Sequence, residues 1–447
     1  MKSAVKRILG IASASLVTLG MAACGAGGNS SQAEGEITLS FWHSTSGGAA
    51  DALDEIVSKF NEDHKGKIKI DAVYQGGYGD AIAKLANSVQ AGNIPDIMQI
   101  NDANTTYIYD TGVTVPAQDL NDAAEQKADF DDLLPSVRQY YSKDGKLMSM
   151  PFMASHPGLF INPDIVAAAG LDPANPPKNR AELIEWATQI KEKTGKHGIV
   201  FHIGSWWFES WTASEGLEFC TPQNGLGDQA AEKFQLAAPE QVAVWSDFQK
   251  LYKNDIALNV STDGKNSQAA FANGEAGMII TSSASLGNLQ KNAQGFEPMA
   301  VHFPIDNPSN GGVVAGGNSV WVFGKDPKGA KEQAAWTFLS YLPSAEAQGM
   351  IFKHSGYLPI SNSAVKELEP QADEARSVLL KQIADNPSNT VTGGCHSGAI
   401  QQVREELGDA LQSILNDGAD PAVTLKKVED DSIVKVKEYN DRAASQR

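Results

Sequence analysis

The order of strands and helices expected over residues 36–102 constrains the fold of this chain most strongly. Apolar and polar residues alternate over 36–40 and over 67–74, as they do in half-buried strands, and a third strand is predicted at 96–100. The two intervening helices are predicted from apolar faces carrying Leu53, Ile56, Val57 and Phe60, then Ile82, Leu85, Ala86 and Val89. Strands that alternate with helices form a parallel sheet covered by helices. The sequence therefore predicts an α/β fold.

The loops after these strands are the first candidates for a binding site. Trp42-His43-Ser44, Tyr78 and Asp102 follow the first, second and third strand respectively. In open α/β sheets, ligands bind beyond the carboxyl ends of the strands. We therefore expect these side chains to lie at one edge of the sheet.

The length of the chain argues for more than one lobe. With 447 residues the chain is too long for one ordinary core. Asp144-Gly145 predicts a hairpin turn, and the chain is expected to cross between lobes just after it, at Pro151. A strand is predicted at 313–323, where Gly316-Gly317 indicates a close approach of the backbone. Further helices are predicted at 181–191, 239–253 and 331–342 and in the C-terminal tail, where Ile400, Val403, Leu407, Ala410, Leu411 and Ile414 share one face.

The first 23 residues are predicted to be a secretory signal peptide. Three basic residues precede the apolar run 8–21, and small residues lead to Cys24. This order resembles the lipobox of bacterial lipoproteins, so Cys24 is predicted to carry a lipid; ordinary cleavage that leaves a free cysteine is the alternative. Residues 24–36 then form a flexible tether. The expected location is extracytoplasmic, anchored to the cell membrane by the N-terminal lipid.

Charge and cysteine content limit the partners. The formal net charge of −18 argues against nucleic acid and against direct binding to anionic lipid. Cys220 and Cys395 have no zinc-type spacing, so a structural disulfide is the favoured interpretation, although the sequence does not bring the two cysteines together.

Residues 277–289 join an apolar strand to a helix through a serine-rich turn. Met278–Ile280 predicts a short buried strand, and Ser282 lies in the turn that follows. Backbone N–H groups at such a turn, together with the helix dipole, suit an anion or sugar hydroxyls. The alternative is that the serines only cap the helix.

Motifs of catalysis and metal binding are absent from the sequence. It contains no GxSxG, HExxH or GxxxxGK[ST] motif, and its eight histidines have no metal-ligand spacing. We therefore expect a binding protein rather than an enzyme, with no cofactor and no metal. Aromatic residues support binding: Trp206, Trp207, Trp211, Tyr78 and Tyr357 could stack on a polyol or a choline-type cation, with core packing as the alternative for each.

Several segments together resemble the extracellular solute-binding proteins of ABC importers, especially those that bind glycerol 3-phosphate. The matching segments are Phe41-Trp42-His43-Ser44, Tyr74-Gln75-Gly76-Gly77-Tyr78, Gly92-Asn93-Ile94-Pro95-Asp96-Ile97, Pro151-Phe152 to Ser155, Ala169-Gly170-Leu171-Asp172-Pro173, Gly274 to Leu289, Gly316-Gly317 before Ser319-Val320-Trp321, and Gly356-Tyr357-Leu358-Pro359-Ile360. The likeness runs from about Phe41 to about Leu415. It implies a type II, two-lobe periplasmic-binding-protein-like fold with the ligand cleft between the lobes. Lobe 1 is then expected to comprise 37–150 and 313–361, and lobe 2 to comprise 151–312 and 362–447.

The resemblance also implies the residues of the site. A phosphate would be held by Tyr78, Ser155, Ser282, Gly317, Tyr357 and Arg404. The glycerol hydroxyls would meet Asp102, with an aromatic residue of the Trp206 to Trp211 cluster as a wall. A well-known member of the family carries glutamate at the positions of Ser46 and Asp102, so this chain leaves more room on the hydroxyl side, which favours a diester or an oligosaccharide.

The expected function is capture of sn-glycerol 3-phosphate or its diesters and delivery to the transmembrane subunits of an ABC permease. The protein is expected to act as a monomer whose lobes close on the ligand. An oligosaccharide-binding lipoprotein is the first alternative, and a surface-anchored phosphodiester or glycan hydrolase is the second.

Overall fold

The computed structural model describes residues 35–227 and 229–446. The predicted signal peptide, Cys24 and nearly all of the predicted tether lie outside the described residues. Among the described helices, none is long and apolar enough to cross a membrane.

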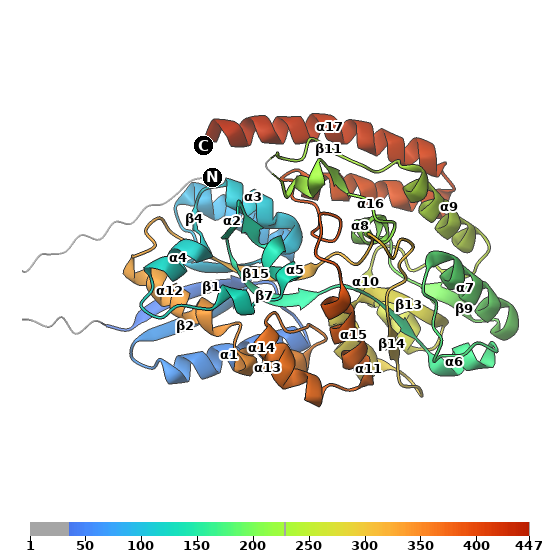
Figure 1. Cartoon of the computed structure of the whole chain (residues 1–447), viewed down its shortest axis with the longest axis horizontal. Coiled ribbons are helices and arrows are strands. Elements are labelled where there is room, and N and C mark those ends of the chain that lie inside the picture. Colours follow the sequence, from blue (N-terminus) through green and yellow to red (C-terminus); the bar gives the residue numbers. More distant parts are fainter. Residues whose placement is uncertain (1–34, 228, 447) are drawn as a thin grey trace, which may run out of the picture. The chain divides into compact units, whose positions relative to one another are not determined.

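Six strands form the first sheet (Figure 1), in the order β2-β1-β3-β15-β4, with β7 also pairing with β15. Their bounds are β1 Ile37–His43, β2 Ile68–Tyr74, β3 Ile97–Asn101, β4 Thr114–Val115, β7 Met150–Ser155 and β15 Gly316–Phe323. Strand β1 runs parallel to β2 and β3, which confirms the arrangement predicted for the first three strands. Strand β15 returns from far along the chain and runs antiparallel to β3, β4 and β7.

Helices cover both faces of this sheet because its central strands are apolar on both sides. On β15, Val320 and Val322 belong to the core beneath α1, whereas Trp321 and Phe323 belong to the core beneath α2. Helix α1 buries the four residues predicted from its periodicity. The helices of this half are α1 Gly48–Asp63, α2 Tyr78–Ala91, α3 Thr105–Asp110, α4 Ala117–Ala123, α5 Pro135–Tyr140, α12 Ala330–Tyr341, α13 Ala345–His354 and α14 Asn362–Leu368.

Five strands form the second sheet, in the order β12-β9-β13-β8-β14. Their bounds are β8 Pro157–Ile161, β9 His197–Val200, β12 Ala257–Leu258, β13 Ala276–Ser282 and β14 Met299–Val301. Strand β13 is buried from Ala276 to Thr281, which confirms the predicted buried strand. The helices of this half are α6 Pro163–Ala168, α7 Arg180–Thr194, α8 Ser205–Ser214, α9 Pro239–Lys253, α10 Gly264–Ala272, α11 Leu286–Asn292 and α15 Glu374–Asp385.

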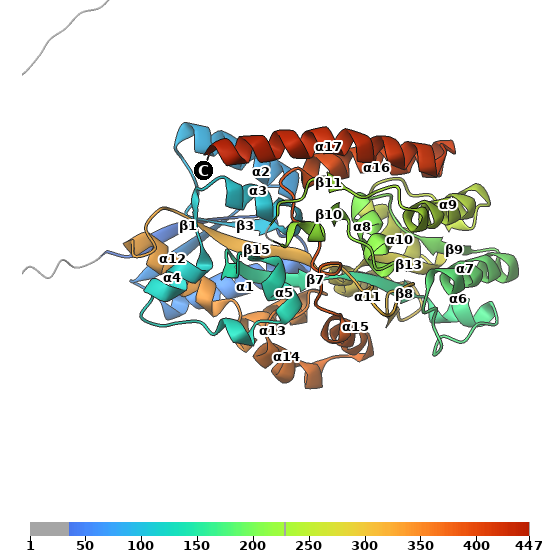
Figure 2. The same cartoon turned by 45° about the horizontal axis from the view of Figure 1, so that its top comes forward.

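Two C-terminal helices, α16 Ile400–Asp417 and α17 Pro421–Gln446, lie side by side in both views (Figures 1 and 2). Helix α16 buries the face predicted from the sequence. Helix α17 is held along β11 (Lys233–Phe234), where Glu429 accepts from the backbone N–H of Leu236 at 2.9 Å. Near its end, the Tyr439 hydroxyl donates to Asp110 Oδ2 at 3.0 Å, so α17 also contacts α3.

Short elements lie between the longer strands and helices. The predicted hairpin is confirmed: β5 (Ser142–Lys143) and β6 (Lys146–Leu147) flank Asp144 and Gly145, both with positive φ. The strand that follows, β7, was expected in lobe 2 but pairs with β15 of the first sheet. The lobe boundaries otherwise stay a prediction. The 3-10 segments are η1 Asp102–Asn104, η2 Phe130–Asp132, η3 Gln223–Gly225, η4 Ser283–Ser285 and η5 Glu369–Gln371.

A disulfide joins Cys220 to Cys395 across 175 residues of sequence, with the two Cα atoms 5.6 Å apart. Cys220 begins β10 (Cys220–Thr221), which pairs with β11, and Cys395 lies just before α16. The favoured pairing is therefore confirmed.

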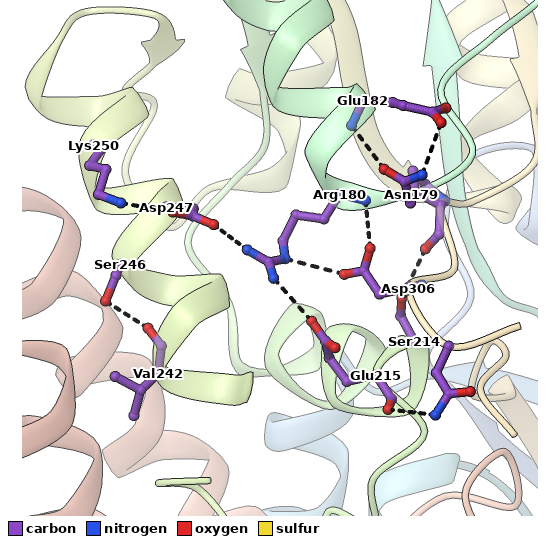
Figure 3. A network of polar contacts seen from close by, with 12 residues as sticks. Asn179, Arg180, Glu182, Ser214, Glu215, Val242, Ser246, Asp247, Lys250 and Asp306 are labelled. Atoms are coloured by element: carbon purple, nitrogen blue, oxygen red, sulfur yellow. Dashed lines mark hydrogen bonds and ion pairs between the residues drawn. The ribbon is translucent and has the colours of Figure 1, made fainter. Parts of the chain in front are cut away.

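In the second half of the molecule, one arginine forms ion pairs with three carboxylates (Figure 3). Arg180, at the start of α7, pairs with Asp306 at 3.2 Å, with Glu215 at 3.3 Å and with Asp247. Its backbone N–H also donates to Asp306 at 2.7 Å. Burial and the neighbouring Asp306 raise the pKa of Glu215 to about 7. The network ties α7 and α9 to the segments that follow α8 and β14.

Candidate ligand-binding site

The predicted site residues of the first sheet meet at one of its edges. Tyr78 begins α2 just after β2, and Asp102 follows β3. Because β15 runs antiparallel to β3, with Asn318 opposite Asn101, Gly317 lies at the same edge. Strand β7 ends there too, with Ser155 opposite Gly316. The topology thus brings together residues that are up to 239 positions apart in the sequence (317 − 78).

Two tyrosines form a hydroxyl pair at this edge. The Tyr78 and Tyr357 side chains interact with each other, and the Tyr78 hydroxyl accepts from Asn318 Nδ2 at 3.2 Å. Burial raises the pKa of both tyrosines, so both stay neutral and can donate to an anion. Asn318 is fully buried, and its Oδ1 has no hydrogen-bond partner among the described residues. Sequence reasoning missed Asn318, although it directly follows the singled-out Gly317.

Gly317 is required by the close approach of two strands. Its φ is 125°, and a Cβ at this position would lie 2.0 Å from the carbonyl oxygen of Met153. A Cβ at the neighbouring Gly316 would lie 2.8 Å from Cζ2 of Trp206 and 3.1 Å from Oγ of Ser155. The indole of Trp206 therefore lies against the glycine backbone and beside Ser155.

The structure separates the three candidate tryptophans of α8: Trp211 is 1% exposed and packs on Phe303, so it belongs to the core. Trp206 is half-buried, whereas Trp207 is 2% exposed and packs on His202 with ring centroids 5.2 Å apart. Neither indole Nε1 has a hydrogen-bond partner within the described residues. Of Trp206 and Trp207, Trp206 is therefore the one with exposed surface that a ligand could contact. Trp207 packs against it from the core, with the two ring centroids 4.9 Å apart.

The serine turn lies next to these residues. Ser283 N donates to the carbonyl oxygen of His156 at 2.9 Å, which brings the turn beside Ser155. Ser282 Oγ accepts from Ala284 N at 3.2 Å and so caps η4. On its other side, a Cβ at Gly356 would lie 2.2 Å from Ser283 O, so the Tyr357 loop packs directly on the turn. Ser282 caps a helical turn, as one interpretation of the sequence held, and it also lies close to the other candidate residues.

Arg404 lies between two carboxylates. It projects from α16, and its side chain is 12% exposed. Nη2 donates to Glu209 Oε2, and Nη1 lies 3.7 Å from Asp102 Oδ2. Burial opposes its charge, but Glu209 and Asp102 outweigh this and raise the pKa of Arg404. Its Nε has no hydrogen-bond partner within the described ranges, so one donor of a buried guanidinium is unused.

The carboxylates differ in their surroundings. Burial raises the pKa of Asp102 to about 6, a rise that Arg404 opposes and Glu209 reinforces. Glu209 is 2% exposed, and its Oε1 accepts from the backbone N–H of Cys395 at 3.0 Å. Sequence reasoning did not select Glu209, because its partners lie 186 and 195 residues away.

Two further tyrosines belong to the same cluster of side chains around Asp102. Tyr140 and Tyr141 are buried, and burial together with Asp102 raises the pKa of both. The ring of His396 lies 4.7 Å from that of Tyr140, and burial lowers its pKa to about 4, so this histidine is neutral. No sequence spacing indicated these three residues.

The arrangement suits a small polar ligand. Hydroxyl donors, an arginine with a free donor, a carboxylate and an indole wall can contact an anionic group at one end and hydroxyls at the other. In the part of the chain that the structure describes, no group of histidine, cysteine or acidic side chains could hold a metal ion.

Comparisons with known proteins place the chain in a family. Residues 55–378 match the family model of the bacterial extracellular solute-binding proteins. The sn-glycerol-3-phosphate-binding periplasmic protein UgpB of Escherichia coli is 30% identical over 419 residues, which are 90% of this chain and 91% of that protein.

Solved structures share the fold. UgpB from Mycobacterium tuberculosis, in complex with glycerophosphocholine, matches with a TM-score of 0.74 and 18% identity, over 90% of this chain and 98% of that one. The GacH receptor of Streptomyces glaucescens matches with a TM-score of 0.76 and 20% identity, over 91% and 99%. The type II fold expected from the sequence is confirmed. The chain therefore belongs to the bacterial extracellular solute-binding proteins.

Proposed function

We propose that the protein captures sn-glycerol 3-phosphate or a glycerophosphodiester and delivers it to the permease of an ABC importer. The observation that carries the proposal is Arg404: a buried guanidinium with an unused Nε–H, at the edge where Tyr78, Tyr357 and Gly317 meet. The 30% identity to UgpB supports the same ligand class.

The phosphate would lie between Arg404, the two tyrosine hydroxyls and the serines Ser155 and Ser282. Charge-assisted hydrogen bonds from a planar guanidinium suit phosphate oxygens in particular. The backbone N–H of Gly317 would add a donor at the same edge of the sheet. Asp102 would accept from the glycerol hydroxyls, and Trp206 would form an apolar wall.

Closure of the lobes would complete the site. Tyr78 and Asp102 belong to the first sheet's half of the molecule, whereas Trp206 and Arg404 come from helices α8 and α16, which pack on each other in the other half. Ligands held from two sides stabilise the closed arrangement of two-lobe proteins.

Membrane attachment through Cys24 is part of the proposal. We expect Cys24→Ser to release the protein from the membrane fraction, because a thioether-linked lipid cannot form on serine. Mass spectrometry of the N-terminal peptide from the membrane fraction checks this, and an unmodified Cys24 would contradict it. Size-exclusion chromatography with light scattering checks the proposed monomer.

An oligosaccharide is the second candidate ligand. Glu209 and Asp102 together compensate the single charge of Arg404, and the indole of Trp206 offers a face on which a sugar ring can stack. The GacH receptor, solved in complex with acarbose, has the same fold.

Calorimetric titration of the purified protein separates the candidates. We expect heat of binding with sn-glycerol 3-phosphate or glycerophosphocholine, and none with maltotriose at the same concentration. Binding of the sugar alone would overturn the phosphate assignment. Release of glycerol 3-phosphate from glycerophosphocholine would instead indicate a hydrolase.

A further inference from the structure

Glu209 is a buried carboxylate whose two oxygens have separate partners. Oε2 accepts from Arg404 Nη2, and Oε1 accepts from the backbone N–H of Cys395 at 3.0 Å. Its side chain is 3% exposed, so it offers no surface to a ligand. A charged group in such a place requires compensation, and it also limits how its partner can move.

We propose that Glu209 is a positioning residue that fixes the guanidinium of Arg404 toward the ligand cleft, and that the Cys220–Cys395 disulfide anchors Glu209 in turn. The proposal rests on the proposed function, in which Arg404 contacts the ligand. Glu209 itself touches no ligand.

The geometry of Arg404 shows why it needs a fixed partner. Its long side chain could turn toward Asp102, whose Oδ2 is already 3.7 Å from Nη1. The hydrogen bond to Glu209 holds the opposite nitrogen, so the guanidinium spans both carboxylates and Nε stays free. Because α8 packs on α16, Glu209 makes this contact within one half of the molecule.

The anchor of Glu209 is rigid. The disulfide joins Cys395 to Cys220. The Oδ1 of Asn224 accepts from Cys220 N at 2.8 Å, and the carbonyl oxygen of Asn224 accepts from His396 N at 2.7 Å. Cys395 is therefore held by its own disulfide and by the backbone hydrogen bond of the next residue.

The charge of Glu209 also affects the pKa of Asp102. The groups that interact with Asp102 are Arg404, Glu209, Tyr78, Tyr140, Tyr141 and Tyr357. Of these, Glu209 carries the second negative charge, and it raises the pKa of Asp102. Removing that charge must lower the pKa of Asp102, whereas a change that only loosens packing has no such specific effect.

The first test uses the ligand-free protein and Glu209→Gln, which keeps the shape and the acceptor for Cys395. Carbon-13 NMR follows the titration of Asp102, and nitrogen-15 relaxation follows Arg404 Nε–H. We expect the Asp102 midpoint to move to lower pH and the Nε–H signal to show increased motion. An unchanged midpoint together with an unchanged Nε–H signal would overturn the proposal.

The second test measures affinity for sn-glycerol 3-phosphate. We expect Glu209→Gln to weaken binding at least 10-fold at pH 7.5, while Glu405→Gln, an exposed change on the same helix, leaves it within twofold. An affinity of Glu209→Gln within twofold of the wild type would overturn the positioning role. Absence of binding by the wild type would instead contradict the proposed function, and the ligand-free test would still decide on Glu209.

The disulfide allows a third, independent test of the proposal. The double variant Cys220→Ser/Cys395→Ser should increase the motion of Arg404 Nε–H when Glu209 is present and should add nothing in the Glu209→Gln background, because the two act in series. Equal effects of the double variant in both backgrounds would show that the disulfide does not act through Glu209. If Glu209→Gln fails to fold, the double variant alone tests the anchor by the same NMR signal.

Discussion

Arg404 is the residue on which the phosphate assignment depends. We expect Arg404→Ala to weaken binding of sn-glycerol 3-phosphate roughly 10- to 100-fold, because a charge-assisted hydrogen bond contributes about 1.5–3 kcal/mol. Arg404→Lys should recover only part of this, since an ammonium cannot donate from Nε and Nη at once. Calorimetric titration provides the affinities. Arg138→Ala removes an exposed ion pair with Asp131 and is the matched control. Equal affinities for Arg404→Ala and Arg138→Ala would remove Arg404 from the site.

Gly317 tests whether the backbone itself forms part of the site. Alanine at this position would place Cβ against Met153 O, at a φ that side chains rarely adopt. We expect Gly317→Ala to lower the free energy of unfolding by about 1–3 kcal/mol and to weaken ligand binding. Chemical denaturation and titration measure the two effects. Gly66→Ala, also at positive φ but with open space around it, separates the conformational cost from the close contact. If both variants lose the same stability, the approach to Met153 is not the cause.

At the residue scale, the sequence could predict which residues lie near the site, but not which side chains they contact. Tyr78 and Asp102 were found because loops after parallel strands share an edge. Trp206 and Trp207 are adjacent, so spacing could not decide which one has exposed surface. Asn318 and Glu209 were missed because their contacts to Tyr78 and Arg404 join residues 240 and 195 positions apart. Such contacts arise only from the fold as a whole.

At the element scale, periodicity predicted the buried faces of two long helices and the first three parallel strands, but only Leu85 of the face predicted for α2 is buried. The apolar faces of α1 and α16 follow from a 3.6-residue period, which is local information. Strand β7 was expected in lobe 2, but it pairs with β15, which lies more than 150 residues later. When a strand is apolar on both faces, its sequence does not indicate which sheet it joins.

The Arg180 network ties helices α7 and α9 to two loops. We expect Arg180→Met to lower the free energy of unfolding by roughly 2–4 kcal/mol, because three part-buried carboxylates lose their shared cation. Urea denaturation at several pH values measures the loss. Lys250→Met, which removes an exposed partner of Asp247 at the rim, should cost less than about 0.5 kcal/mol.

The same network sets a direction for pH dependence. The pKa of Glu215 is about 7 in the folded protein and 4.5 in its ordinary state. Between these values the folded protein retains a proton that the unfolded chain has released, so the contribution of Glu215 to stability decreases as the pH rises through this window. The decrease in the free energy of unfolding caused by Arg180→Met should therefore be larger at pH 8 than at pH 5. An equal loss at both values would show that Glu215 is not coupled to Arg180.

At the scale of the whole molecule, one of the hydrophobic clusters spans both sheets, while each sheet also packs against a cluster of its own half. A single cluster of buried residues contains Met150 and Phe152 of the first sheet together with Phe160 and Ile279 of the second. The Cys220–Cys395 disulfide and the contact of Tyr439 with Asp110 add further connections between distant segments. We expect closure on a ligand, as proposed above, to keep this cluster intact.

A shared core predicts that residues 36–447 unfold as one unit. We expect a single transition in differential scanning calorimetry of the ligand-free protein, with equal calorimetric and van't Hoff enthalpies, because the buried cluster that spans both sheets couples their unfolding. A ligand at 100 times its Kd should add about 2.7 kcal/mol to the free energy of unfolding and raise the transition without splitting it. Two resolved transitions without ligand would show that the halves unfold independently. In that case a ligand that bridges Tyr78 and Arg404 should merge them, whereas one bound to a single half would shift only one.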